Sequence, residues 1–199
     1  MTTDESFSDQ LEGWLSSDEP KTLGSLGEVF AEKSFATTVL FLMLLPAIPL
    51  PTGGITHVFE AITVVVAAQM VLGQRTLWLP DRWKNRPLGE VTTQKAIPLM
   101  VRSVRRFERF SRPRGQWVFE GWSLRLIGLL LMGFAIGAAL APPFSGLDTL
   151  PALGAVAVAL SIILEDVVVL AVGAAIGMGG IVIIVTLGAA LVRVVQGLF

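Results

Sequence analysis

The sequence feature that most constrains the fold is a long apolar stretch, Phe41–Trp78, that prolines interrupt. It contains Leu44-Leu45-Pro46-Ala47-Ile48-Pro49-Leu50-Pro51-Thr52-Gly53-Gly54. Proline lacks the backbone N–H and clashes with the carbonyl four residues earlier, so no straight helix continues through Pro46–Pro51. In a bilayer, irregular backbone must be buried in protein or line a wet cavity. The stretch therefore predicts a broken helix inside a membrane protein.

A second stretch, Leu126–Gly173, is built in the same way. Its apolar helix is followed by a break at Pro142-Pro143-Phe144-Ser145-Gly146 and a shorter apolar helix. Ile62–Gln69 aligns with Val158–Glu165, so a polar residue recurs at the same place. Two broken hydrophobic segments at corresponding positions indicate a membrane binding site. The residues expected in these broken-helix loops are Pro46, Pro49, Pro51, Thr52, Pro142 and Pro143.

The composition places the chain among membrane proteins. Hydrophobic residues make up 53% and charged residues 16% of the sequence, whereas soluble chains have about 25% charged residues. The sequence has no cysteine, which excludes a disulfide scaffold and thiolate metal sites. The single histidine, His57, leaves little for an imidazole metal site. We therefore expect an all-α integral membrane protein without metal, cofactor or catalytic residues.

Charge is segregated along the chain. Residues 1–34 hold eight acidic residues against Lys21 and Lys33, whereas residues 75–115 hold eleven basic residues against three acidic ones. Basic segments between spans mark the cytoplasmic side of a membrane protein. Segment 75–115 is therefore expected in the cytoplasm.

These patterns divide the chain into parts. Residues 1–22 are acidic and poor in apolar groups, which predicts a disordered tail. The remainder is expected to form one membrane domain, with repeat one at 23–89, a basic amphipathic linker at 90–116, repeat two at 117–177 and a C-terminal helix at 179–198. An inverted repeat is one form of such a fold, but the sequence leaves the orientation of the two halves open.

The last boundary rests on Gly177-Met178-Gly179-Gly180, which lies within the uncharged run Val167–Val192. A helix of this length overshoots the bilayer, so two helices are favoured over one that is kinked and tilted. Short re-entrant helices leave apolar flanks that need cover, which favours a homodimer.

Four polar residues are candidates for a substrate or ion path. Glu165 and Asp166 come first, because adjacent acids between long apolar runs are costly in a bilayer and indicate function by default. Alternatively, the helix ends there and both acids lie at the membrane surface. Glu60 and Gln69 follow, and their alternative role is hydrogen bonding between helices.

The arginine-rich segment supplies a further candidate site. Its simplest roles are topology and attraction to anionic lipids. A more specific role is binding the phosphate of a lipid-linked saccharide, because the guanidinium group matches phosphate oxygens. The residues of this predicted anion site, in which Glu108 would pair with the arginines, are Arg105, Glu108, Arg109, Arg112 and Arg114. No nucleic-acid partner is expected, because nothing resembles a reading motif.

Several of these motifs together resemble the ExoD family of bacterial inner-membrane proteins. They are Pro49-x-Pro51, Gln69-x-x-x-Gly73, Trp78-Leu79-Pro80, the run Arg105–Arg114, and Leu150-Pro151-Ala152 ahead of the acidic pair. The resemblance covers about residues 22–180. It implies a multi-pass inner-membrane protein with a role in exopolysaccharide synthesis, and no defined reaction. One departure is Asp166-Val167, where the family tends to have an acid followed by glycine.

Three functions are open at this point. The leading one is a transporter-like protein of envelope polysaccharide production, with a polar path at the two broken-helix repeats for an anionic or lipid-linked substrate. The second is a non-catalytic accessory protein that scaffolds a polysaccharide synthesis complex through its basic surface. An enzyme acting on lipid-linked intermediates ranks last, because no nucleophile–base set is visible.

Overall fold

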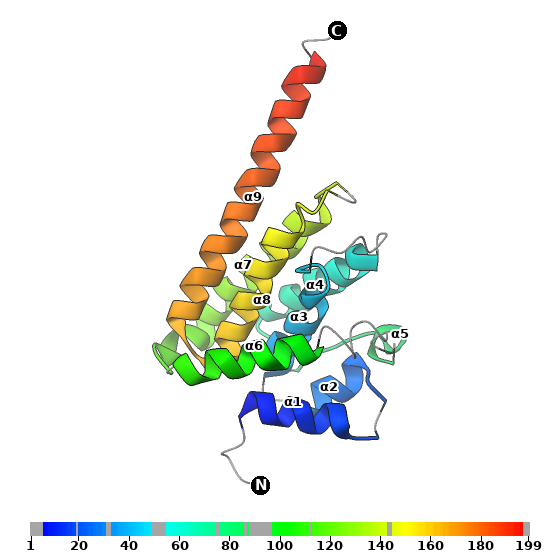
Figure 1. The fold of residues 1–199 in the computed structure, drawn as a ribbon, viewed down its shortest axis with the longest axis vertical. Coiled ribbons are helices and arrows are strands. Elements are labelled where there is room, and N and C mark those ends of the chain that lie inside the picture. Colours follow the sequence, from blue (N-terminus) through cyan, green and yellow to red (C-terminus); the bar gives the residue numbers. More distant parts are fainter. Residues whose placement is uncertain are drawn as a thin grey trace.

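The computed structural model describes residues 6–18, 20–30, 33–48, 55–74, 76–85, 87, 97–111, 113–142 and 145–196. This part of the chain is helical, with turns and two isolated bridges but no strand, which confirms the predicted all-α class. The helices are α1 (Phe7–Ser16), α2 (Leu23–Val29), α3 (Ser34–Leu44), α4 (Ile55–Val71), α5 (Asp81–Lys84), α6 (Ile97–Phe110), the 3-10 helix η3 (Gln116–Phe119), α7 (Gly121–Ala139), α8 (Thr149–Leu164) and α9 (Val167–Gln196) (Figure 1).

Helices α3, α4, α7 and α8 form a bundle of two hairpins. α3 ends at Leu44, two residues before Pro46, and α7 ends at Ala139, three residues before Pro142. The helices therefore end where proline would remove a backbone donor. The other residues expected in the loops lie outside the described residues: Pro49, Pro51, Thr52 and Pro143. The hairpins contact one another mainly through α3 against α8 and α4 against α7.

Both hairpins begin and end at the same end of the bundle, here called the base, where α1, α2 and α6 also lie (Figure 1). The start of α3, the end of α4, the start of α7 and the end of α8 all line one cavity of about 820 Å³. Lys33, just before α3, bonds to the carbonyl of Ile163 near the end of α8, and Gly128 near the start of α7 lies against Met70 near the end of α4. The two hairpins therefore run in the same direction, which is a parallel and not an inverted arrangement.

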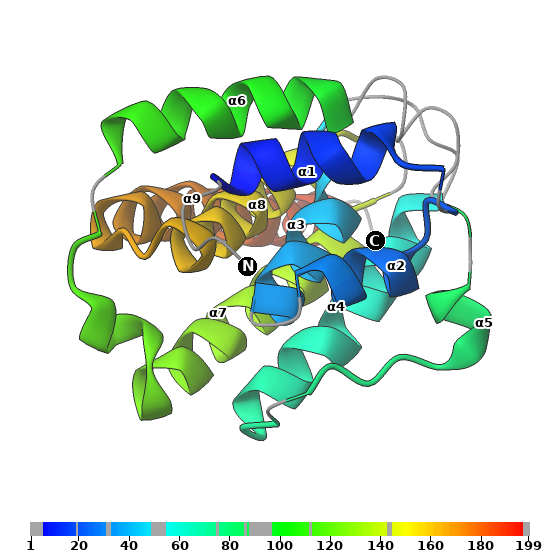
Figure 2. The same cartoon turned by 90° about the horizontal axis from the view of Figure 1, so that it is seen from below.

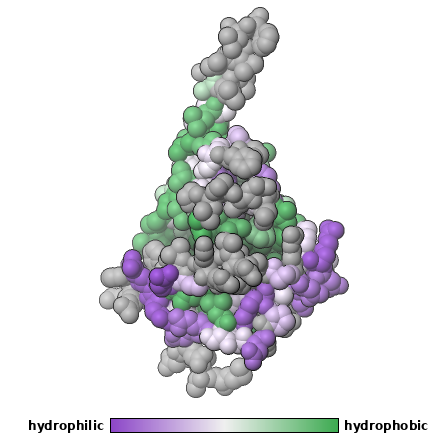
Figure 3. Space-filling model, turned by 45° about the vertical axis from the view of Figure 1, so that its right-hand side comes forward, coloured by the Kyte–Doolittle hydropathy of each residue, from purple (hydrophilic) through white to green (hydrophobic). Residues whose placement is uncertain are grey.

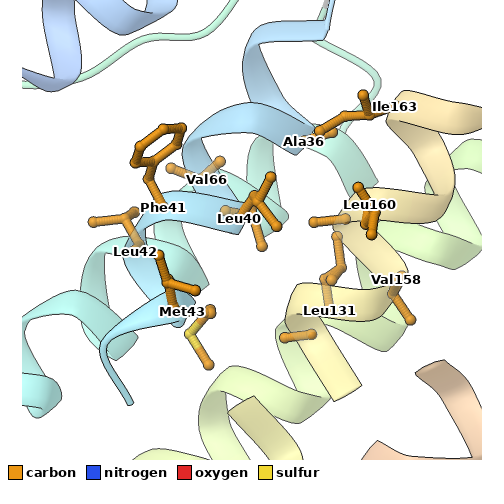
Figure 4. Close-up of a cluster of buried hydrophobic side chains, with 14 of the residues drawn as sticks. Ala36, Leu40, Phe41, Leu42, Met43, Val66, Leu131, Val158, Leu160 and Ile163 are labelled. Atoms are coloured by element: carbon orange, nitrogen blue, oxygen red, sulfur yellow. The ribbon is translucent and has the colours of Figure 1, made fainter. Parts of the chain in front are cut away.

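Helix α3 lies in the middle of the bundle. Its side chains Phe41, Leu42 and Met43 are at most 1% exposed. They belong to a buried cluster that also contains Leu131 of α7 and Val158 of α8 (Figure 4). Close packing of this kind holds helices together whether the surroundings are water or lipid. At 11 residues, α3 is about 16 Å long and reaches about halfway across a bilayer core.

Helix α9 is continuous over 30 residues, so the predicted break at residues 177–180 is wrong. The glycines there permit close packing. A Cβ on Gly177 would lie 2.3 Å from the ring of Phe134, and a Cβ on Gly154 would lie 2.4 Å from the Cα of Gly177. Small residues let membrane helices approach one another closely. The glycines of this run therefore allow α9 to pack closely against α7 and α8.

Two described helical segments are long and apolar enough to cross a membrane, Gly121–Ala139 and Val167–Ala190. Only 33% and 17% of their apolar windows are buried, so they leave most of their surface uncovered, unlike the core helix of a soluble protein. Figure 3 shows apolar surface on the upper part of the molecule and hydrophilic surface around the base. Apolar surface of this extent suits contact with lipid.

The first 22 residues, expected to be disordered, contain helix α1. Its side chains Leu11 and Trp14 are buried in the core, and the ring of Trp14 meets that of Phe41 edge-on with centroids 6.1 Å apart. Two apolar side chains three residues apart on one helical face thus outweigh the acidic composition that predicted disorder. α1 lies beside α6 (Figure 2), and α6 is amphipathic as expected, with Val101 and Val104 buried.

The packing of α9 gives a first prediction. Gly177→Ala should destabilise the protein, because the added Cβ must displace the Phe134 ring and overpacking costs about 1–3 kcal/mol. Gly179→Ala adds a Cβ where nothing lies within 4 Å, and alanine favours a helix over glycine by up to about 1 kcal/mol. It should therefore be neutral or slightly stabilising. The apparent melting temperature in detergent measures both variants, and equal values would contradict the packing role of Gly177.

Candidate functional site

The turn between α8 and α9 organises the charged groups of the base. Glu165 ends α8 with φ 53° and ψ 37°, a left-handed conformation that costs a non-glycine residue about 1–2 kcal/mol. No other described non-glycine residue has a positive φ. The Arg114 N–H donates to the Glu165 carbonyl at 2.9 Å, and the Val167 N–H donates to the Arg114 carbonyl at 3.3 Å. Backbone strain is concentrated at functional sites, which makes this turn the first candidate.

The Glu165 carboxylate joins three elements. Lys33 Nζ donates to its Oε1 at 3.1 Å, and Gln116 Nε2 donates to its Oε2 at 2.9 Å. Lys33 also donates to the carbonyl of Ile163 at 2.6 Å, one of the carbonyls that a helix C-terminus leaves without a partner. The hydrogen bond from Lys33 lowers the pKa of Glu165, against the opposing effect of burial. Glu165 is therefore ionised at neutral pH.

Lys33 and Glu165 line two cavities and stand between them. One cavity, of about 590 Å³, extends toward α1 and includes Glu108 and Ser111. The other, of about 820 Å³, lies among the four helix ends of the base and includes Arg125. Both volumes fall within the roughly 300–1,000 Å³ that is usual for ligand sites. With Lys33 and Arg125 in its wall, the second cavity can accept an anionic group.

Asp166 has a different environment from its neighbour. It is 4% exposed. Ser111 Oγ donates to its Oδ2 at 2.9 Å, and the Val168 N–H donates to its Oδ1 at 2.9 Å. The carboxylate thereby caps the first turn of α9 and holds the segment that follows α6. The adjacent acids are thus divided: Glu165 faces the cavities, and Asp166 stabilises the turn.

The structure does not bring Glu60 and Gln69 together. Gln69 Oε1 accepts the Trp78 N–H at 2.8 Å, and its Nε2 donates to the Trp78 carbonyl at 2.9 Å, so it fastens the connector after α4 at the base. Glu60 lies toward the other end of α4, is fully buried and contacts His57 Nδ1 at 2.7 Å. Its Oε1 has no hydrogen bond within the described part of the chain.

The predicted arginine site is partly occupied by α1. Arg105 Nη2 lies 2.8 Å from Glu12 and 3.4 Å from Asp9. Glu108 accepts hydrogen bonds from the backbone and the hydroxyl of Ser8 at 3.1 and 2.6 Å, and its predicted pairing with arginines stays a prediction. The acidic N-terminal helix therefore binds groups that were expected to hold a phosphate. The side chain of Arg109 and the whole of Arg112 lie outside the described residues, whereas Arg114 is exposed beside the turn.

Four residues of the site were not among those predicted from the sequence: Lys33, Gln116, Ser111 and Arg125. One signal was available for Lys33, which is a basic residue at the end of an acidic segment and directly before an apolar helix. The roles of Gln116 and Ser111 depend on the return of the chain after α6 to the α8–α9 turn. Neither composition nor spacing contains that information.

Comparison of the sequence with known proteins identifies the family to which the chain belongs. The sequence model described as "Exopolysaccharide synthesis, ExoD" matches residues 7–186. The chain belongs to the ExoD family. It is 30% identical over 171 residues to Protein ExoD of Rhizobium meliloti (strain 1021), covering 81% of this chain and 68% of that protein. It is also 27% identical over 153 residues to the uncharacterized protein slr1875 of Synechocystis, covering 74% and 70%. No solved structure matches this ExoD-family chain.

The pairing of Lys33 with Glu165 predicts a pH-dependent contribution to stability. Because the folded state lowers the pKa of Glu165, the contribution is present above the ordinary glutamate pKa and lost as the pH falls through the lower, folded value. Both side chains are about one-third exposed, so the contribution should be below about 1 kcal/mol.

A double-mutant cycle of Lys33→Met and Glu165→Gln, measured by thermal unfolding in detergent, checks this prediction. The coupling should be constant from pH 6 to pH 8 and decline below about pH 4.5, where glutamates become protonated. A coupling that persists unchanged in acid would contradict the ion pair.

Proposed function

We propose that this ExoD-family protein is a multi-pass inner-membrane protein of exopolysaccharide production that receives an anionic or lipid-linked substrate at its base, in a transporter-like role. Family membership carries the general role in exopolysaccharide synthesis. The observation that carries the specific proposal is the Lys33–Glu165 pair between two cavities, where the ends of both hairpins meet.

The distribution of residues supports an orientation with the base toward the cytoplasm. Trp78, Trp117 and Trp122 lie near the base and are between 63% and 74% exposed. Tryptophan prefers headgroup depth, and basic segments prefer the cytoplasmic side. Exposed apolar side chains continue along α7 and α9 away from the base, as far as Leu140 and Leu187.

The geometry of the ion pair supports binding of an anion. Lys33 is held by a carboxylate and a carbonyl oxygen, and an incoming phosphate can replace Glu165 as its partner without leaving the ammonium group buried and unpaired. Arg125 lies in the same cavity. The substrate would thereby separate Glu165 from Lys33, and since Glu165 is part of a strained turn, its release can change the position of α9 relative to α8.

In this proposal the path continues to the Glu60–His57 pair, near the end of α4 that lies away from the base. A path from the base would have to pass along the contact between the hairpins to reach it. In this proposal Gln69 belongs to the scaffold and not to the path, because both ends of its amide bind the Trp78 backbone.

A second candidate function is that of a non-catalytic accessory protein in a polysaccharide synthesis complex. It is favoured by Arg102 and Arg106 on α6, both of which are exposed and able to bind an acidic partner. Neither candidate assigns a chemical step to the protein.

Complementation of a strain that lacks the protein distinguishes the two candidates. Glu165→Gln and Lys33→Met should each reduce exopolysaccharide output about tenfold or more, the effect of losing one charged contact to a substrate. Glu120→Gln is the matched control, because Glu120 is exposed and makes no cap hydrogen bond at α7. Each variant must reach the membrane at the wild-type level.

The outcomes separate the two roles. Loss of output in the Lys33 and Glu165 variants, with normal output in Glu120→Gln and in Arg102→Gln/Arg106→Gln, supports substrate binding at the base. Normal output from the first pair together with loss in the arginine double variant would refute it in favour of the accessory role.

A further inference from the structure

An apolar groove of about 630 Å³ runs between α3, α8 and α9 and shares Ser111 with the smaller basal cavity. Its lining runs from Asp166 at the base to Ile48 and Leu153, near the ends of α3 and α8 that lie away from the base, and Val104 of α6 also lines it. Figure 1 shows α6 at the base, beside the lower part of the bundle. Its walls are aliphatic side chains from three helices, among them Leu40, Leu44, Leu153, Leu160, Val172 and Ile176.

The groove is polar at its basal end alone, where Ser111, Arg114 and Asp166 line it. Both oxygens of Asp166 accept hydrogen bonds, one from Ser111 and the other from the Val168 N–H, and the residue is 4% exposed. Arg114 is fixed by its backbone to the turn. Its side chain is exposed and makes no ion pair with any residue in the described part of the chain.

We propose that this groove binds the hydrocarbon chain of a polyprenyl phosphate, with Arg114 on the phosphate. The inference rests on the membrane orientation proposed above and gives the lipid-linked substrate a site of its own. A guanidinium group beside an aliphatic groove matches the chemistry of a lipid phosphate, because it forms charge-assisted, often paired hydrogen bonds to phosphate oxygens.

The dimensions favour a lipid with one chain. From Val168 to Ile176 the wall of α9 spans eight helical steps, about 12 Å, and the inner side is closed by the packed core. A phospholipid has two chains, and the second would remain outside. Val168 and Val172 are 49% and 52% exposed, so the groove is open to the apolar surface of α9 and a chain can enter sideways from the bilayer.

The test is a titration of the purified full-length protein in neutral detergent, read by native mass spectrometry. Farnesyl phosphate serves as a short polyprenyl probe, and farnesol, phosphatidylglycerol and phosphatidylethanolamine are the comparison lipids. Val172→Trp and Leu153→Trp fill the groove from two helices, and Val185→Trp, exposed on α9 away from the groove, is the matched control. Arg114→Gln tests the phosphate contact, with Arg106→Gln as its control.

We expect farnesyl phosphate to bind about tenfold more tightly than farnesol, the effect of one charge-assisted contact, and Arg114→Gln to remove that preference. Both groove-filling variants should weaken binding about tenfold while Val185→Trp does not, at unchanged melting temperature. Equal binding by Val172→Trp, Leu153→Trp and Val185→Trp would overturn the proposal, as would phosphatidylglycerol displacing the probe at equal concentration. Conversion of a dimer to a monomer by the groove-filling variants, with probe binding intact, would overturn it in favour of an interface with a second copy.

This titration is independent of the complementation test. Farnesyl phosphate binding by Glu165→Gln at the wild-type level, together with lost exopolysaccharide output, would support both sites as separate. Absence of probe binding in a wild-type protein that complements normally would refute the groove and leave the basal site in place.

Discussion

The left-handed turn at Glu165 is the constraint on which the base of the protein depends. Two residues connect α8 to α9, and the first of them, Glu165, takes the left-handed conformation in which many helices end, usually at a glycine. The strain is offset by contacts from two distant segments: Lys33 before α3, and residues 114–116, through the Arg114 backbone and the Gln116 side chain. These contacts bring together parts of the chain that are more than 130 residues apart. Lys33 and Glu165 also line both basal cavities, so the contacts that stabilise the turn also form the candidate site.

The common direction of the two hairpins explains why polar groups gather at one end. Each hairpin returns to the base, so that four helix ends, with their unpaired backbone groups, lie close together. Lys33 donates a hydrogen bond to one such carbonyl, that of Ile163, and Gln69 donates one to the Trp78 carbonyl in the connector after α4. The opposite end holds the buried Glu60 and its partly exposed partner His57. A substrate path would therefore connect an open, charged entrance with a polar pair of which Glu60 is buried and His57 is partly exposed.

The sequence predicted the all-α class and the ends of two helices, because proline acts locally: α3 and α7 end within three residues of Pro46 and Pro142. The predicted break in α9 was wrong because a glycine that interrupts a helix cannot be told from a glycine that permits close packing unless the partner helix is known. The sequence failed to predict α1 because composition does not show that Leu11 and Trp14 face a core. For the site, Glu165 was recognisable as an acid between apolar runs, whereas Lys33 and Gln116 depend on tertiary contacts.

The pairing of α1 with α6 bears on where an anion can bind. Asp9 and Glu12 neutralise Arg105, and Ser8 satisfies Glu108. An anion that binds this part of α6 must displace a helix whose Leu11 and Trp14 are embedded in the core, which costs far more than an exposed ion pair returns. The Lys33–Glu165 pair, by contrast, is about one-third exposed and lines both basal cavities, so an anion can reach Lys33 without displacing α1. This difference in cost favours the Lys33–Glu165 site over the α6 arginines as the place where a charged substrate is first held.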